Sequence, residues 1–126
     1  LRHVLRHERR DSAARLTEQA KAYIEEHYKE SDLSADSLCR CLNVSAAYFS
    51  TIFKREVGMS FVAYLTKIRL EHALELLRTT EDKTYIIASR VGYMEPNYFS
   101  YVFKKQYGIS PSKYRAEMCE KEKNTD

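Results

Sequence analysis

Two pairs of basic residues occupy the same place in two nearly identical stretches of this chain. Lys54-Arg55 follows the letters YFSTIF, and Lys104-Lys105 follows the letters YFSYVF. Cationic side chains placed in this way can bind phosphate groups. Positive charges near the end of a helix also interact favourably with the helix dipole when no ligand is present. The pairs alone are consistent with both interpretations.

The surrounding stretches, residues 48–60 and 98–110, are identical at seven of thirteen positions. Helical spacing predicts that each stretch buries a similar apolar face. These faces are Phe49, Ile52 and Phe53 in the first copy, and Phe99, Val102 and Phe103 in the second. The opposite faces differ in chemistry: Ala47, Ser50 and Thr51 against Asn97, Ser100 and Tyr101. A constant core with variable outward residues is typical of two binding surfaces on one scaffold, although unconstrained drift would give the same pattern.

Catalytic and metal-binding patterns are not found in this sequence. Cys39 and Cys41 are two positions apart in an expected helix, so they point to different faces and cannot share a metal ion. With Cys119 they are expected to be reduced thiols. The four histidines are scattered, and no glycine-rich phosphate loop is present. The sequence therefore predicts no enzymatic activity, no metal and no cofactor.

Composition and charge favour a globular protein whose basic residues are concentrated around the second copy. The chain is 44% hydrophobic and 31% charged, and no stretch has the length and apolarity of a membrane span. A cytoplasmic protein is expected, and Leu1 in place of Met suggests a fragment of a longer chain. The net charge is only +3. Residues 83–115, however, hold six Lys or Arg against one Asp or Glu. Such clustering suits phosphate binding, and it makes the second copy the expected anchor.

The elements that position these residues are all expected to be helices. No segment shows the alternation that is typical of strands. Helical spacing predicts helices over about 12–29, 35–42, 46–58, 60–79, 84–91 and 96–107, and a last helix from Pro111 that frays into the tail 119–126. Ser34, Ser45 and Ser60 are expected as N-caps. Asn43 and Gly92 fall where a left-handed turn is expected.

The pattern predicts a domain order with two similar units. In the helix expected over 60–79, the apolar residues change faces midway along its length. This suits a rod between two small helical bundles. The expected parts are a basic connector at 1–16, a first helix-turn-helix subdomain at 17–59, a linking helix at 60–79, a second helix-turn-helix subdomain at 80–115 and a charged tail at 116–126. Within the connector, residues 1–10 either extend the first helix or are frayed.

Two long segments carry a family resemblance. YFSTIFKREVGMSFVAYLTKIRLEHALELL and IIASRVGYMEPNYFSYVFKKQYGISPSKYR resemble the DNA-binding domain of the AraC/XylS family of bacterial transcription regulators. The resemblance covers about residues 17–115. It implies an all-α fold of about seven helices, in which two recognition helices enter successive major grooves of double-stranded DNA roughly 34 Å apart.

The resemblance also implies site residues. Base contacts of the family map onto Ala47, Ser50, Thr51, Pro96, Asn97 and Tyr101. Helical spacing adds Ser100 to the expected base contacts, and the two basic pairs are the expected phosphate contacts: Lys54, Arg55, Lys104 and Lys105. The amide of Asn97 can bond N6 and N7 of one adenine together, so Asn97 is the best candidate for a specific contact. The small residues of the first helix offer weaker direct contacts. Glu95 stands where Asp or Ser is commoner, and a weaker helix cap is expected there.

The resemblance implies partners outside these residues. RNA polymerase is an expected partner, and a homodimer is expected through the region before Leu1. The stretch from Ala20 to Ser50 also resembles the subgroup in which this domain follows a phosphoacceptor receiver. The alternative function is a helical protein-interaction module, such as an RNA polymerase contact, with weak or secondary DNA binding.

Overall fold

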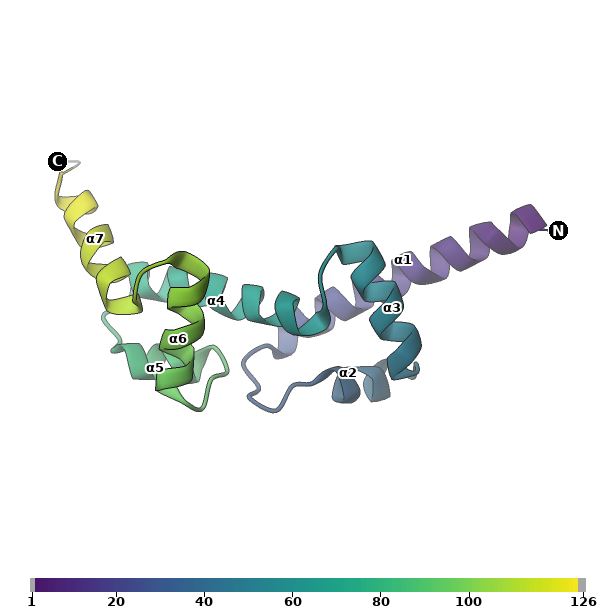
Figure 1. Cartoon of the computed structure of the whole chain (residues 1–126), viewed down its shortest axis with the longest axis horizontal. Coiled ribbons are helices and arrows are strands. Elements are labelled where there is room, and N and C mark those ends of the chain that lie inside the picture. The colour runs from purple at the N-terminus through teal and green to yellow at the C-terminus, as the bar shows by residue number, and fades with distance from the viewer. Residues whose placement is uncertain (1, 125–126) are drawn as a thin grey trace. The chain divides into compact units, whose positions relative to one another are not determined.

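The computed structural model describes the backbone of residues 2–124 and the side chains of residues 10–123. Within these residues every regular element is an α-helix (Figure 1). The helices are α1 (Arg2–His27), α2 (Ala35–Leu42), α3 (Ala46–Val57), α4 (Phe61–Thr79), α5 (Thr84–Arg90), α6 (Pro96–Tyr107) and α7 (Pro111–Asn124). This confirms the expected all-α class with seven helices. None of the helices described here has the length and apolarity needed to cross a membrane.

The chain forms two compact units. The first contains the residues up to Tyr28 and Asp32–Lys67, and the second contains Lys29–Ser31 and the residues from Ile68 onward. The change of unit therefore falls inside α4, where the apolar face of the helix was expected to switch sides. Phe61 and Leu65 are buried in the first unit, and Leu70, Ala73 and Leu77 are buried in the second.

In the first unit α1 packs against both α2 and α3. Small residues make this close approach possible, because Ala13 and Ala20 of α1 are almost fully buried. From α3, Phe49 and Phe53 fill the core, with their ring centres 5.3 Å apart. The inward face expected from helical spacing is therefore the buried one.

The first helix starts earlier than residue 12. Of the two alternatives for the basic segment 1–10, the structure has the helical extension, with α1 continuous from Arg2. Ala13 and Leu16 are buried, so the part of α1 that contains them belongs to the core of the first unit. The side chains of residues 1–9 lie outside the described part of the chain. The domain limits at 16, 59, 79 and 115 stay predictions.

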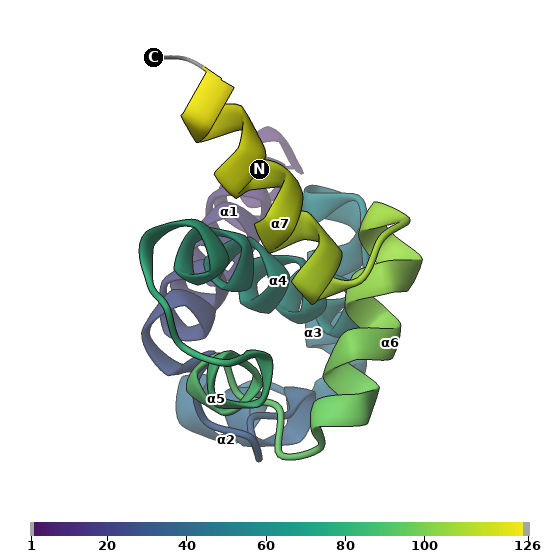
Figure 2. The same cartoon turned by 90° about the vertical axis from the view of Figure 1, so that its left-hand side faces the viewer.

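In the second unit α6 packs against α5 and α7, and Figure 2 shows both of these helices on the same side of α6. Its Phe99 and Phe103 are fully buried, as are Ile87 and Ala88 of α5. Val102, which was expected on the same face, is only half-buried. Tyr114 of α7 lies with its ring centre 6.0 Å from that of Phe103, in an edge-to-face arrangement.

The last helix does not fray at Cys119, as the sequence analysis expected, but continues to Asn124. Two local features explain the difference. The segment has no Gly or Pro after Pro111, and Glu117 and Lys121 stand in the favourable i, i+4 order. Residues 125 and 126 of the expected tail lie outside the described residues. At its start α7 is held by Arg115, which donates hydrogen bonds to the carbonyl oxygens of Leu77 and Thr80.

Candidate nucleic-acid interface

Each unit contains a short helix, a turn and a longer helix whose outer face is exposed. In the first, Ser34 and Ser37 form a reciprocal capping box at the start of α2, and the Ser45 hydroxyl accepts a bond from the Tyr48 N–H at the start of α3. Asn43 ends α2 with a φ of 58°, the left-handed conformation that was expected. The turn is thus held at both ends, which orients α3.

The second unit repeats this arrangement with weaker capping. Gly92 takes a φ of 106° in the turn, as expected, and Pro96 occupies the first turn of α6. Glu95 stands at the N-cap and makes no side-chain cap hydrogen bond. The expectation of a weaker cap at this position is confirmed. Ser60 and Ser110 cap α4 and α7 through bonds from the N–H groups of Ala63 and Lys113.

One row of α3 is exposed along its whole length. Ala47, Thr51 and Arg55 are spaced at i, i+4 and i+8, so they lie on one face, and all three are exposed. The Thr51 hydroxyl donates to the carbonyl oxygen of Ala47 at 3.1 Å, which leaves its oxygen as an acceptor only. Ser50 and Lys54 are exposed beside this row.

The equivalent row of α6 consists of Asn97, Tyr101 and Lys105. All three are exposed, and 61% of the Tyr101 surface is accessible. The Lys105 ammonium lies 6.0 Å from the centre of the Tyr101 ring, within the range of a cation–π interaction. Lys104 is exposed, whereas Ser100 is half-buried. The candidate residues of each unit therefore share one face, with Ser100 at the edge of the second.

An aromatic row next to this face was not predicted from the sequence. Tyr93, Tyr98 and Tyr101 follow one another with ring centres 5.9 and 6.5 Å apart. Together with Met94, which is 80% exposed, Tyr93 and Tyr98 line a pocket of about 460 Å³. The clue in the sequence was the cluster of three tyrosines within nine positions, at 93, 98 and 101.

Arg69 of α4 contacts Tyr93, the first residue of this aromatic row. It is buried, its guanidinium carbon lies 5.3 Å from the centre of the Tyr93 ring, and it donates a 2.8 Å hydrogen bond to the carbonyl oxygen of Glu30. Burial lowers the pKa of Arg69, and the interaction with Tyr93 opposes that shift. Arg69 was not singled out in the sequence, because nothing in the local pattern of α4 distinguishes it from an exposed arginine.

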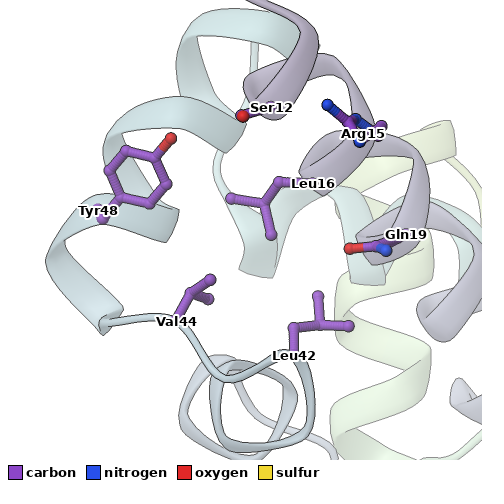
Figure 3. Close-up of a pocket in the computed structure, with 7 residues that line it drawn as sticks. All are labelled: Ser12, Arg15, Leu16, Gln19, Leu42, Val44 and Tyr48. Atoms are coloured by element: carbon purple, nitrogen blue, oxygen red, sulfur yellow. The ribbon is translucent and has the colours of Figure 1, made fainter. Parts of the chain in front are cut away.

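The first unit has a smaller pocket between α1 and the turn, with a volume of about 280 Å³ (Figure 3). Leu16, Leu42 and Val44 point toward one another at its centre, and polar groups of α1 stand at its margin. Its lining is Ser12, Arg15, Leu16, Gln19, Leu42, Val44 and Tyr48. None of these residues belongs to the exposed row of α3.

Within the described residues, neither the cysteines nor the other side chains that commonly bind metals (His, Asp and Glu) form a further site. Cys39 is buried and both Cys41 and Cys119 are exposed, all three as free thiols. Burial, and secondarily the charge of Asp36, raise the pKa of Cys39. No group of three or more His, Cys, Asp or Glu side chains in the described part of the chain is placed to hold a metal ion.

Comparison with known proteins gives matches to transcription regulators. The family model described as "Helix-turn-helix domain" matches residues 38–117. The HTH-type transcriptional regulator YisR of Bacillus subtilis is 38% identical over 101 residues, which are 80% of this chain and 35% of that protein. This chain thus spans about a third of the length of that relative.

Two solved structures are similar over most of their length. The C-terminal domain of AraT, a response regulator from Geobacillus stearothermophilus, has a TM-score of 0.80 and 47% identity, covering 81% of this chain and 84% of that one. The DNA-binding domain of AdpA, solved in complex with a target DNA, has a TM-score of 0.76 and 27% identity, covering 80% and 90%. From its seven helices, its two exposed helix-turn-helix rows and these matches, the chain belongs to the AraC-type helix-turn-helix family.

Proposed function

We propose that this chain binds double-stranded DNA in a sequence-specific manner and thereby regulates bacterial transcription. The observation that carries the proposal is the pair of matched rows, Ala47–Thr51–Arg55 and Asn97–Tyr101–Lys105, each on the second helix of a capped helix-turn-helix unit. The second helix of such a motif is the one that enters the major groove. The DNA complex of the AdpA domain supports this proposal, because that domain has the same fold.

The exposed residues have two distinct roles in the proposal. Base edges are contacted by Ala47, Ser50, Thr51, Pro96, Asn97, Ser100 and Tyr101, and phosphates are contacted by Lys54, Arg55, Lys104 and Lys105. Base contacts set the preferred sequence, and phosphate contacts set affinity and its dependence on salt. α3 and α6 are proposed to enter successive major grooves.

The second unit is the stronger anchor in this proposal. Its row has an amide at Asn97 that can bond both N6 and N7 of adenine, and its basic pair has no acidic residue within α6. In the first unit the Thr51 hydroxyl already donates within the helix, and Ala47 can offer only a methyl group. Direct base contacts there are expected to be weaker.

The proposed protein partners follow from the relatives of this chain, since no contact within the described residues identifies them. Relatives of this chain are named transcriptional regulators, so contact with RNA polymerase and dimerisation through other parts of a longer protein are consistent with the proposal. The similarity to the AraT domain supports a role in a response regulator. A DNA-binding role in bacteria implies the cytoplasm as the location.

A fluorescence anisotropy titration tests the proposal. The chain is titrated into a labelled duplex of about 30 base pairs, long enough for two successive major grooves, at several salt concentrations. Replacing both Lys104 and Lys105 by Ala should weaken binding to every sequence and reduce the salt slope by about 0.9 for each lost phosphate contact. Identical salt slopes for the wild type and the double variant would refute the phosphate assignment.

The second candidate is a helical protein-interaction module. The small, internally bonded face of α3 favours it for the first unit, since that face offers little to a base edge. If the isolated chain retards no duplex even at low salt, this alternative replaces the first proposal.

A further inference from the structure

At the C-terminal end of α3, the basic residue Arg55 forms an ion pair with its neighbour Glu56. Arg55 donates to a single oxygen, Oε1 of Glu56, from both Nε at 3.2 Å and Nη2 at 3.0 Å. Both side chains are exposed, with 60% of the Arg55 side chain and 38% of the Glu56 side chain accessible. The Nε and Nη2 edge of the guanidinium, which could bind a phosphate oxygen, is therefore occupied by a carboxylate oxygen.

The second unit lacks this carboxylate. Fifty positions on, Lys105 corresponds to Arg55 and Gln106 corresponds to Glu56. A neutral amide cannot neutralise the neighbouring ammonium, and Lys105 lies over the Tyr101 ring instead. α6 contains no Asp or Glu, whereas Glu56 is the one acidic residue of α3. The two units thus differ by one charge at an otherwise equivalent place.

We infer that Glu56 competes with a DNA phosphate for Arg55 and so limits the contribution of the first unit to binding. This inference rests on the proposed function, and it names the residue that makes the two units unequal. Arg55 must leave Glu56 before it can bind phosphate, and an exposed ion pair of this kind is weak enough to open. The carboxylate also repels the DNA backbone, which acts in the same direction.

The ion pair between Arg55 and Glu56 also affects how DNA binding by the first unit depends on salt. In the first unit, one cation is partly satisfied before DNA arrives, so fewer counterions are displaced from DNA when that unit binds. In the second unit, the equivalent pair Lys104 and Lys105 has no acidic residue beside it on α6.

Four variants of the 126-residue chain test the inference. Glu56→Gln removes the competing charge, and Gln106→Glu installs the same charge in the second unit. Arg55→Gln, alone and combined with Glu56→Gln, shows whether Glu56 acts through Arg55. Glu26→Gln on α1 is the matched control, because it changes the net charge equally at an exposed position outside α3. Far-ultraviolet circular dichroism checks that each variant is folded.

Binding to the same labelled duplex of about 30 base pairs is measured by anisotropy at several salt concentrations. Glu56→Gln should tighten binding about two- to fivefold and steepen the salt slope by up to about 0.9, and Gln106→Glu should weaken binding by a similar factor. In the Arg55→Gln background, Glu56→Gln should lose most of its effect.

Two results overturn the inference while the wild type still binds. One is an effect of Glu56→Gln no larger than that of Glu26→Gln. The other is an undiminished effect of Glu56→Gln in the Arg55→Gln background, which would make it a general charge effect. Failure of the wild type to bind the duplex at low salt would instead remove the proposed function, and the inference with it.

Discussion

The guanidinium carbon of Arg69 lies 5.3 Å from the centre of the Tyr93 ring, and this contact joins α4 to the turn before α6. Tyr93 in turn packs against Phe99, with ring centres 5.6 Å apart, at the start of the helix that carries Asn97 and Tyr101. A buried cation placed against a turn residue restricts where that turn can lie. Arg69 is therefore a positioning residue for α6.

Replacing Arg69 by Ala should destabilise the second unit by about 2 kcal/mol, because it removes a buried charged donor to the Glu30 carbonyl oxygen and the face of the Tyr93 ring loses its partner. Urea unfolding followed by circular dichroism measures this loss. Arg69→Lys is the matched control, since it keeps the charge and loses the planar fork. A Lys variant as stable as the wild type would show that charge alone, without stacking, holds the turn.

The cap of α6 offers a stabilising substitution. Glu95 is too long to accept the bond that Ser45 accepts from Tyr48 at the equivalent place in the first unit. Glu95→Asp keeps the charge and should stabilise the chain by about 0.5–1 kcal/mol, while Ser45→Ala should cost about 1 kcal/mol. Thermal unfolding monitored at 222 nm compares the two. An unchanged melting temperature for Glu95→Asp would mean that the backbone at residue 95 cannot place a shorter acceptor.

Asn43 tests the left-handed turn of the first unit. Asn43 has a φ of 58°, in the left-handed region. Asn43→Ala should destabilise the chain by about 1 kcal/mol, because alanine is strained there and lacks the polar side chain that can form a local hydrogen bond. Asn43→Gly should be close to neutral, since glycine adopts the same backbone without strain. The comparison is made by urea unfolding. Equal losses for Ala and Gly would point to the Asn43 side chain, and not the backbone, as the source of stability.

Most of the fold could be predicted from the sequence because its signals are local. Serine caps, the left-handed Asn43 and the i, i+3, i+4 spacing of Phe49, Ile52 and Phe53 each act within one helical turn, and the structure has all of them. The continuation of α7 past Cys119 is harder to predict, because the polar, charged composition of 119–124 is common to frayed tails and to exposed helices held by i, i+4 pairs.

The candidate site could be predicted only in part. Periodicity identifies the exposed rows of α3 and α6, since exposure follows from the position of the core. It cannot identify partners chosen by side-chain rotamers, such as Arg55 with Glu56, or contacts between distant segments, such as Arg69 with Glu30. These depend on how helices are packed in three dimensions.

The three thiols should differ in reactivity. Cys39 is buried and its pKa is raised, so little of it is thiolate near neutral pH, whereas Cys41 and Cys119 are exposed. Titration of the native chain with a thiol reagent should give two fast reactions and one slow one, and urea should make all three fast. Three equal rates in the native chain would contradict the burial of Cys39.

Asn97 is expected to determine one base pair of the preferred site. Its side chain is exposed in the first turn of α6, on the row that continues to Tyr101, so Asn97→Ala should leave stability and salt dependence almost unchanged. The loss of a bidentate contact should remove about 1–3 kcal/mol of discrimination at that base pair. Selection of bound duplexes from a randomised pool, carried out with wild type and variant, measures the preference at every position.

Ala47→Asn is the reciprocal variant, because residue 47 occupies the same place in α3. It should introduce a new preference for adenine in the other half of the site. If Asn97→Ala relaxes no position, or weakens binding to all sequences equally, then Asn97 contacts the backbone and another residue of α6 determines the sequence.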